Sequence, residues 1–113
     1  TLAHAIERAN DYTWRHGDAV AVGCCFAARL AQARGLLSAD DVARHDQLFS
    51  RVGLPTRYEG STLDELTHIM LSDKKVRRGI LRFVLLEGIA HPATVSVDPQ
   101  ELQAPASQIG IRA

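Results

Sequence analysis

Two histidines near the start of the chain have the residue type needed for metal binding or proton transfer. His4 lies in the segment Thr1-Leu2-Ala3-His4-Ala5-Ile6-Glu7, and His16-Gly17-Asp18 follows twelve positions after His4. Neutral imidazole is the commonest metal ligand in proteins, and it titrates near neutral pH. One histidine does not make a metal site, so on the residues alone His16 is more simply a helix-start or surface histidine. His4 is likewise compatible with an ordinary half-buried histidine, whose ring Glu7, three positions on, could orient.

A basic cluster is the second candidate for chemistry. Lys74, Lys75, Arg77 and Arg78 place four cations within five positions, directly after Asp73. Such a cluster could clamp a phosphate or a carboxylate. A solvated loop is the plainer interpretation when the cluster is taken alone. The remaining histidines, at positions 45, 68 and 91, are assigned no role.

Charge and hydropathy exclude several classes of function. Thirteen basic residues balance thirteen acidic ones, so no overall positive field would hold nucleic acid or an anionic membrane. The longest weakly polar stretch, residues 19–33, contains Arg29 and Gln32 and is shorter than the roughly 20 apolar residues of a membrane span. The start of the chain has no signal-peptide pattern. A single domain over residues 1–113 is expected.

The two cysteines indicate packing rather than chemistry. Cys24 and Cys25 are adjacent, and neighbours on a helix point about 100° apart, so a disulfide between them is disfavoured. They are expected to be reduced and to pack as small apolar residues, which fits a cytoplasmic protein.

Helical periodicity dominates the first two thirds of the chain. Helices are predicted over residues 2–10, from Asp18 to a Gly35 cap, and over residues 39–52 with Ser38 as N-cap. In the second of these, one stripe is expected in the core and a small-residue stripe is expected to admit a close neighbour. The core stripe is Val22, Phe26, Leu30 and Ala33, and the small-residue stripe is Ala19, Gly23, Ala27 and Ala31. The third helix is expected to bury Val42, Leu48, Phe49 and Val52.

The last third changes pattern. A capping box at Thr62 to Glu65 predicts a further helix that ends near Ser72. Residues 80–86 and 94–97 then predict a small β-hairpin. Asp98-Pro99 predicts a last helix that Pro105 shortens, and the tail after Gly110 is expected to be disordered. The fold class is therefore mainly α, a compact helical domain with a small β-hairpin.

Several segments resemble those of the 3-dehydroquinate synthase family, most closely its actinobacterial members. Thr1 to Glu7 resembles the last seven positions of a family motif like Asn-x-Gly-His-Thr-x-x-His-Ala-Ile-Glu, whose first histidine would fall just before Thr1. Four further segments resemble family segments in the same order, and together they span nearly the whole chain: residues 16–20, 53–55, 73–75 and 81–85. Asp18 stands where many members have Glu.

The resemblance implies that the chain is the helical C-terminal metal and substrate domain of a two-domain enzyme, with an NAD-binding domain upstream. It implies NAD and Zn²⁺ or Co²⁺ as cofactors, His16 as one of three metal ligands, and no primary NAD contact within this chain. His4 would hydrogen-bond the substrate or a water molecule at the metal and help to move protons. Lys74 or Lys75 would pair with anionic groups of the substrate, a sugar phosphate. Homodimerisation is a family expectation, and the isolated chain is expected to be inactive.

Two other interpretations stay open. A sister sugar-phosphate cyclase or a metal-dependent polyol dehydrogenase would share the architecture. Alternatively, the chain could be a stand-alone helical interaction module whose histidines are incidental. An exposed apolar cleft would argue against such a module.

Overall fold

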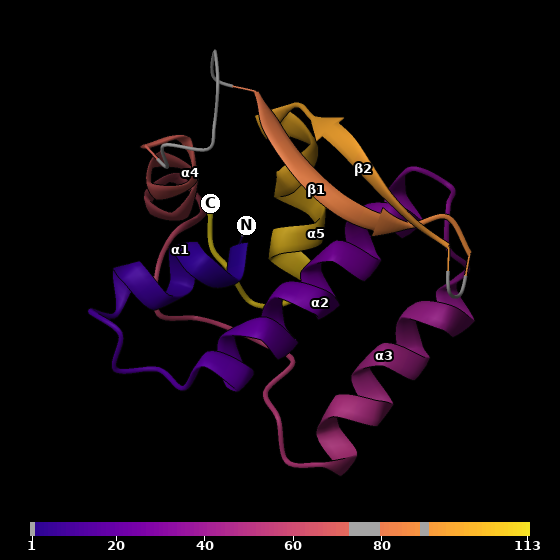
Figure 1. The fold of residues 1–113 in the computed structure, drawn as a ribbon, viewed down its shortest axis with the longest axis horizontal. Coiled ribbons are helices and arrows are strands. Elements are labelled where there is room, and N and C mark those ends of the chain that lie inside the picture. The colour runs from indigo at the N-terminus through magenta and orange to yellow at the C-terminus, as the bar shows by residue number, and fades with distance from the viewer. Residues whose placement is uncertain (1, 73–79, 89–90) are drawn as a thin grey trace.

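The predicted fold class, mainly helical with one β-hairpin, is confirmed. The computed structural model describes residues 2–72, 80–88 and 91–113. Figure 1 shows how the elements are arranged. In chain order they are the helices α1 (Leu2–Ala9), α2 (His16–Ala33), α3 (Ala39–Arg51) and α4 (Leu63–Ser72), the strands β1 (Leu81–Leu86) and β2 (Pro92–Val97), the 3₁₀ helix η1 (Pro99–Leu102), and α5 (Gln103–Gln108).

Helix α2 is the centre of the molecule. It contacts α1, α3, β1 and α5, and it crosses the middle of the view in Figure 1. Val22, Phe26 and Leu30 are fully buried, as the core stripe predicted. The fourth member of that stripe, Ala33, is exposed because it is the last residue of the helix. The stripe therefore faces the core over all but its final turn.

The small-residue stripe of α2 does admit a close neighbour. A Cβ atom built on Gly23 would lie 3.2 Å from the Cβ of Ala3 in α1. That distance is shorter than ordinary carbon–carbon contact, so a larger residue at position 23 would push α1 away. This close approach matters because α1 and α2 together carry both candidate histidines.

Helix ends follow the predicted capping residues in most cases. Gly35 has φ +77° after α2, a left-handed conformation that glycine adopts without strain. The Ser38 hydroxyl accepts a hydrogen bond from the Asp41 amide at 3.1 Å and caps α3. Thr62 caps α4 by accepting from the Glu65 amide at 3.2 Å. The Glu65 carboxylate accepts from the Thr62 hydroxyl, so only half of the predicted capping box forms.

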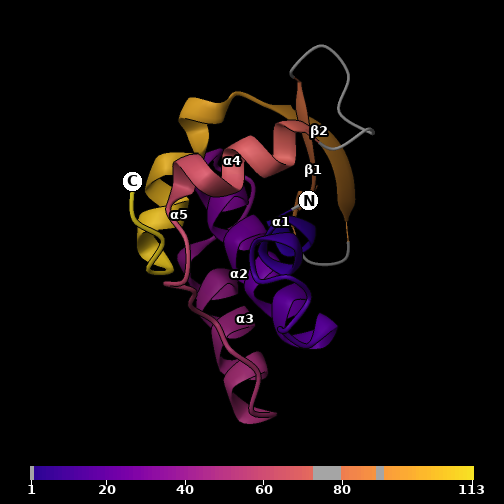
Figure 2. The same ribbon diagram turned by 90° about the vertical axis from the view of Figure 1, so that its left-hand side faces the viewer.

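The predicted burial of α3 is wrong for two residues. Leu48 is 61% exposed and Val52 is 71% exposed. Helix α3 packs mainly on α2 and projects from the rest of the molecule, as Figures 1 and 2 both show. Only the narrow stripe that faces α2 is covered, with Val42 buried and Phe49 partly buried. Val52 lies beyond Arg51, the last helical residue.

The hairpin packs against the middle of α2 through β1. Strand β1 pairs antiparallel with β2, from Leu81 opposite Val97 to Leu86 opposite Pro92. Leu81, Phe83 and Leu85 are buried, and the Phe83 ring lies 5.8 Å from the Phe26 ring. Strand β2 starts at Pro92, two residues before the predicted Thr94. The predicted apolar run is therefore a strand whose alternate residues face the core.

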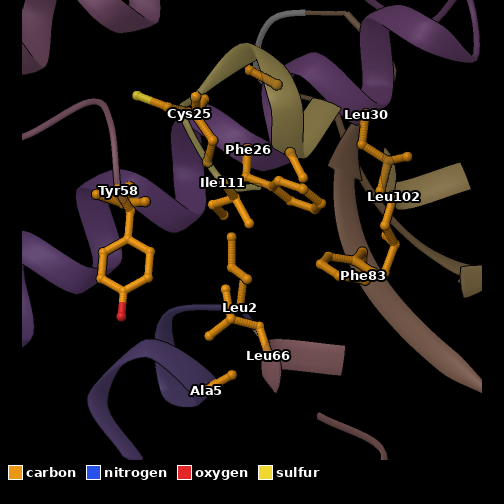
Figure 3. Packing of buried hydrophobic residues seen from close by; sticks show 14 of the residues in the cluster. Leu2, Ala5, Cys25, Phe26, Leu30, Tyr58, Leu66, Phe83, Leu102 and Ile111 are labelled. Atoms are coloured by element: carbon orange, nitrogen blue, oxygen red, sulfur yellow. The ribbon is translucent and has the colours of Figure 1, made fainter. Parts of the chain in front are cut away.

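The C-terminal segment is ordered, contrary to the prediction. Ile109 and Ile111 are 0% and 2% exposed, and the Leu63 amide donates to the carbonyl of Arg112 at 2.6 Å. Pro105 does not shorten α5, which continues to Gln108. Proline is tolerated there because the first-turn amides of a helix have no intrahelical acceptor. Two apolar residues thus fasten the tail to the core shown in Figure 3.

No helix among the residues that the structure describes is long and apolar enough to cross a membrane.

Candidate functional site

The candidate site is built where α1 turns into α2, a region called here the α1–α2 corner and formed by residues 4–16. His16 Nδ1 lies 3.0 Å from Glu7 Oε1 across this corner. The Glu7 side chain is only 16% exposed, whereas that of His16 is 77% exposed. The pair therefore consists of a partly buried carboxylate and an imidazole that projects into solvent.

The backbone of the corner explains why the two side chains meet. The amide of Tyr12 donates to the carbonyl of Glu7 at 2.8 Å, which closes the end of α1. Asp11 and Tyr12 both have positive φ, 50° and 60°, so the chain reverses through two left-handed residues. Arg15 is extended at the N-cap of α2, and His16 is the first helical residue. The reversal returns His16 toward the last turns of α1.

This arrangement leaves one ring nitrogen free for chemistry. An ionised carboxylate can only accept hydrogen bonds, so His16 donates from Nδ1–H to Glu7 Oε1. The other ring nitrogen, Nε2, lies on a side chain that is largely exposed. A carboxylate on one nitrogen fixes the tautomer and the orientation of histidines that bind metals through the other nitrogen. The Glu7–His16 pair fits one such ligand.

The sequence pointed to a different partner for Glu7. The spacing suggested that Glu7 orients His4, but the structure pairs Glu7 with His16, nine positions away. Helical spacing identifies neighbours within α1, and it contains no signal for a contact made by a reversal with two left-handed residues. His4 is exposed and precedes Glu7 by three positions on the same helix, which places their Cβ atoms about 5–6 Å apart.

The remaining predicted site residues are not placed. Lys74 and Lys75 lie outside the described residues. Among the residues that are described, no group of three or more His, Cys, Asp or Glu side chains could hold a metal ion. A metal bound through His16 would therefore take its other ligands from elsewhere in the protein.

A second carboxylate contacts α2 in its middle and makes a contrasting arrangement. Asp46 of α3 receives two hydrogen bonds from the Arg29 guanidinium, at 3.0 and 2.5 Å. Burial raises the pKa of Asp46, but the hydrogen bonds and positive charge of Arg29 outweigh it and leave this pKa below its ordinary value. Burial and then hydrogen bonding to Asp46 raise the pKa of the Cys25 thiol to about 12. This cluster holds α3 on α2, with the Cys25 side chain fully buried and that of Arg29 only 14% exposed.

Both cysteines are free, Cys25 buried and Cys24 half-buried. Cys25 belongs to the hydrophobic core, as predicted for a packing residue.

An apolar hollow of about 340 Å³ opens beside α1 and α2. Val20 and Val84, which are 39% and 62% exposed, lie on its wall, together with side chains of α1, α2 and both strands. The full lining is Leu2, Ala3, Val20, Gly23, Cys24, Ala27, Arg82, Phe83, Val84 and Thr94. The described surface thus includes an exposed apolar cleft.

Comparison with known proteins gives consistent relatives. The 3-dehydroquinate synthase of Corynebacterium jeikeium is 51% identical over 102 residues, which cover 90% of this chain and 28% of that protein. The enzyme of Mycobacterium leprae is 49% identical over 100 residues, 88% of this chain and 28% of that protein. The chain therefore spans less than a third of the length of these relatives.

A solved structure of a different enzyme has the same fold over nearly the whole chain. The 2-deoxy-scyllo-inosose synthase complexed with carbaglucose-6-phosphate, NAD⁺ and Co²⁺ matches with a TM-score of 0.81 and 28% identity, over 95% of this chain and 31% of that one. The family model described as 3-dehydroquinate synthase C-terminal matches residues 1–76, a range that includes the whole α1–α2 corner. The chain belongs to the 3-dehydroquinate synthase family and corresponds to its C-terminal region.

Proposed function

We propose that the full protein containing this chain is a 3-dehydroquinate synthase. It would convert 3-deoxy-arabino-heptulosonate 7-phosphate into 3-dehydroquinate and phosphate, a step toward aromatic amino acids. The observation that carries the proposal is the Glu7–His16 pair, which presents a free Nε2 at the position where the family resemblance implies a metal ligand. Identities of 44–51% to relatives that are named 3-dehydroquinate synthase support the choice of reaction.

His16 would hold a divalent metal through Nε2, with Zn²⁺ or Co²⁺ as the ion. When bound, such an ion would supply positive charge that polarises a ketone and the hydroxyls next to it. Glu7 would keep the imidazole in one tautomer and one orientation, and its own carboxylate is only 16% exposed. His16 on α2 would therefore bind the metal, and Glu7 on α1 would orient the His16 ring.

His4 would act on the substrate directly. It is exposed and lies one helical turn from Glu7, so its ring can reach a molecule held beside His16. An imidazole near neutral pH can donate or accept a proton, which suits it to a substrate hydroxyl that gains and loses protons. Lys74 and Lys75 remain the proposed partners of the substrate's anionic groups on sequence grounds.

The proposal extends to parts of the protein beyond this chain. A relative of this fold was solved with NAD⁺, Co²⁺ and a sugar-phosphate analogue. We infer that an NAD-binding domain upstream of residue 1 completes the active site in a cleft between the two domains. Homodimerisation and a cytoplasmic location, which the free cysteines favour, belong to the same proposal.

The alternatives have less support. A sister cyclase is favoured by the fold, yet 2-deoxy-scyllo-inosose synthase is 28% identical, well below the 51% of a dehydroquinate synthase. A stand-alone interaction module is disfavoured by the 51% identity to a 3-dehydroquinate synthase, which the match covers to 28% of its length. The apolar hollow beside α1 and α2 does not separate the two interpretations, because such surfaces mark ligand sites as well as protein–protein contacts.

The test is phosphate release from the heptulosonate phosphate by the full protein, with NAD and either Co²⁺ or Zn²⁺. His16→Ala should abolish the activity, with partial recovery at high metal concentration. His91→Ala is the matched control, because His91 is exposed and has no proposed role. Absence of phosphate release by the wild type would exclude the synthase. Full activity of His16→Ala would keep the family and remove the ligand assignment.

A further inference from the structure

Tyr58 is a buried residue whose hydroxyl sits where three parts of the chain meet. Its side chain is 2% exposed, and its hydroxyl accepts a hydrogen bond from Asn10 Nδ2 at 2.8 Å. The same hydroxyl is 2.8 Å from the hydroxyl of Ser61, the one buried polar residue in the described part of the chain. In Figure 3 Tyr58 lies beside the labelled apolar side chains, with its hydroxyl directed toward the ribbon of α1.

The contacts of Tyr58 fall on both sides of the α1–α2 reversal. Asn10, which precedes the two left-handed residues, also donates to the Ile6 carbonyl at 2.8 Å, so it ties Tyr58 to the last turns of α1. Trp14, which follows them, meets the Tyr58 ring edge-on, with centroids 5.1 Å apart and an interplanar angle of 81°. Tyr58 therefore contacts the connection at its start and near its end.

The conformation of the reversal needs such support. Asp11 and Tyr12 have φ of 50° and 60°, and non-glycine residues hold a left-handed conformation only where the surroundings determine it. Both side chains are exposed, so they have little packing of their own. The hydrogen bond to Asn10 and the ring contact with Trp14 supply the fixed points on either side.

The segment that carries Tyr58 is itself anchored. The Tyr58 amide donates to the carbonyl of Ile109 at 2.8 Å, and Ile109 is fully buried. A Cβ atom on Gly60 would lie 2.8 Å from the Tyr58 hydroxyl oxygen, closer than such atoms approach. The loop therefore passes tightly behind the hydroxyl and leaves it little room to move.

We infer that Tyr58 is a positioning residue for the metal ligand His16. The ring and hydroxyl of Tyr58 fix the reversal, the reversal sets the separation of α1 and α2 at the corner, and this separation holds His16 Nδ1 against Glu7. Tyr58 acts through the backbone and touches neither His16 nor any substrate. The inference rests on the proposed role of His16.

The test compares two hydroxyl deletions in the full protein. Tyr58→Phe keeps the ring and removes the hydroxyl; Ser38→Ala, the control, removes the hydroxyl that caps α3, away from the corner. Co²⁺ affinity is measured by chelator competition with the visible cobalt spectrum as signal, well below the unfolding temperature. Tyr58→Phe should weaken binding by about 3- to 10-fold, less than the 10- to 100-fold typical of direct ligand partners, and Ser38→Ala should not change it.

A second readout separates this inference from the metal site itself. The ¹⁵N shifts of the His16 ring, in the metal-free protein, report whether Nδ1 carries the proton. Tyr58→Phe should shift the ring from the Nδ1–H form toward a mixture of tautomers. Unchanged affinity and unchanged ring shifts would overturn the inference. Cobalt binding that is indifferent to His16→Ala would instead remove the ligand role, while the tautomer shift would still decide whether Tyr58 positions the ring.

If Tyr58→Phe does not fold, Gly60→Ala replaces it. This change leaves Tyr58 in place and displaces its hydroxyl by steric contact, so the same loss of affinity and the same ring shift are expected. A folded Gly60→Ala protein with wild-type values of both would count against the inference.

Discussion

Helix α2 contacts a carboxylate from a neighbouring helix at two places, and the two contacts have different roles. At the first residue of α2, His16, the partner is Glu7 of α1, and the His16 side chain is 77% exposed. In the middle of α2, Asp46 of α3 meets an Arg29 side chain that is 14% exposed. The first contact uses one ring nitrogen and leaves the other in solvent, whereas the second engages two guanidinium nitrogens with both carboxylate oxygens. A pair in which both carboxylate oxygens are engaged by a largely buried guanidinium stabilises the fold, whereas an exposed imidazole with a second ring nitrogen can bind a ligand.

The largest expected effect comes from breaking the pair in the middle of α2. Arg29→Ala should lower the free energy of unfolding by about 2–3 kcal/mol, because it leaves the partly buried Asp46 carboxylate without its charged donor. Denaturant unfolding at neutral pH measures this. Arg57→Ala is the control, since the Arg57–Glu59 pair is 3.7 Å long with side chains that are 61% and 72% exposed, and it should cost less than about 0.5 kcal/mol. Equal losses in the two variants would remove the distinction between the pairs.

The next effect tests the corner. Glu7→Ala should weaken Co²⁺ binding by the full protein about 10- to 100-fold, because the His16 ring loses the acceptor that fixes its tautomer. Glu7→Gln, which keeps a neutral acceptor oxygen, should lose less. Asp46→Asn should bind cobalt like the wild type, even though it weakens the other pair. A loss of affinity in Asp46→Asn as large as in Glu7→Ala would mean that the two regions are not separate.

How much of this could be predicted from the sequence depends on the range of each interaction. The core positions Val22, Phe26 and Leu30 of α2, the cap at Ser38 and the apolar run that forms β1 depend on local sequence, and these predictions hold. Leu48 and Val52 are exposed because α3 packs mainly on α2 and few other elements contact it. Local spacing does not indicate how many elements pack on a helix. Ile109 and Ile111 are buried in a segment whose partners, Tyr58 and the start of α4, lie about 50 positions earlier in the chain.

The candidate site divides in the same way. His16 and His4 could be named from the motif around them, but Tyr58 could not, because it lies 48 positions from Asn10 in a segment that has no chemical signature. The Glu7–His16 contact depends on two left-handed residues, Asp11 and Tyr12. Neither is a glycine, so the sequence contains no residue that predicts a left-handed turn there. Residues that position a site through tertiary contacts thus need a structure to be found.

A smaller effect concerns acid. Because the pKa of Asp46 in the folded state lies below its ordinary value of 3.8, its ionised form stabilises the fold above that pH. This stabilisation is lost as the pH falls through the lowered value. Stability should therefore fall below about pH 4, and Asp46→Asn should be less stable than the wild type at pH 6 while losing less on acidification. Measured unfolding free energies that fall equally in both proteins between pH 6 and pH 3 would assign the acid sensitivity to other groups.

The smallest expected effect is the reactivity of the Cys25 thiol, which should be close to nil. The thiolate is the nucleophile, and a pKa of about 12 leaves about one thiol in ten thousand ionised at pH 8. Cys25 is also fully buried, so an alkylating reagent has no access without opening of the α2–α3 contact. Mass spectrometry of the native protein should find Cys25 unmodified and, after denaturation, fully modified. Asp46→Asn should change this little, since burial is the larger cause of the raised pKa, whereas Arg29→Ala should speed alkylation by opening α3 more often. Fast modification of native wild-type Cys25 would show that the middle of α2 is as open as the corner, and the contrast between the two carboxylates would then lie in their partners alone.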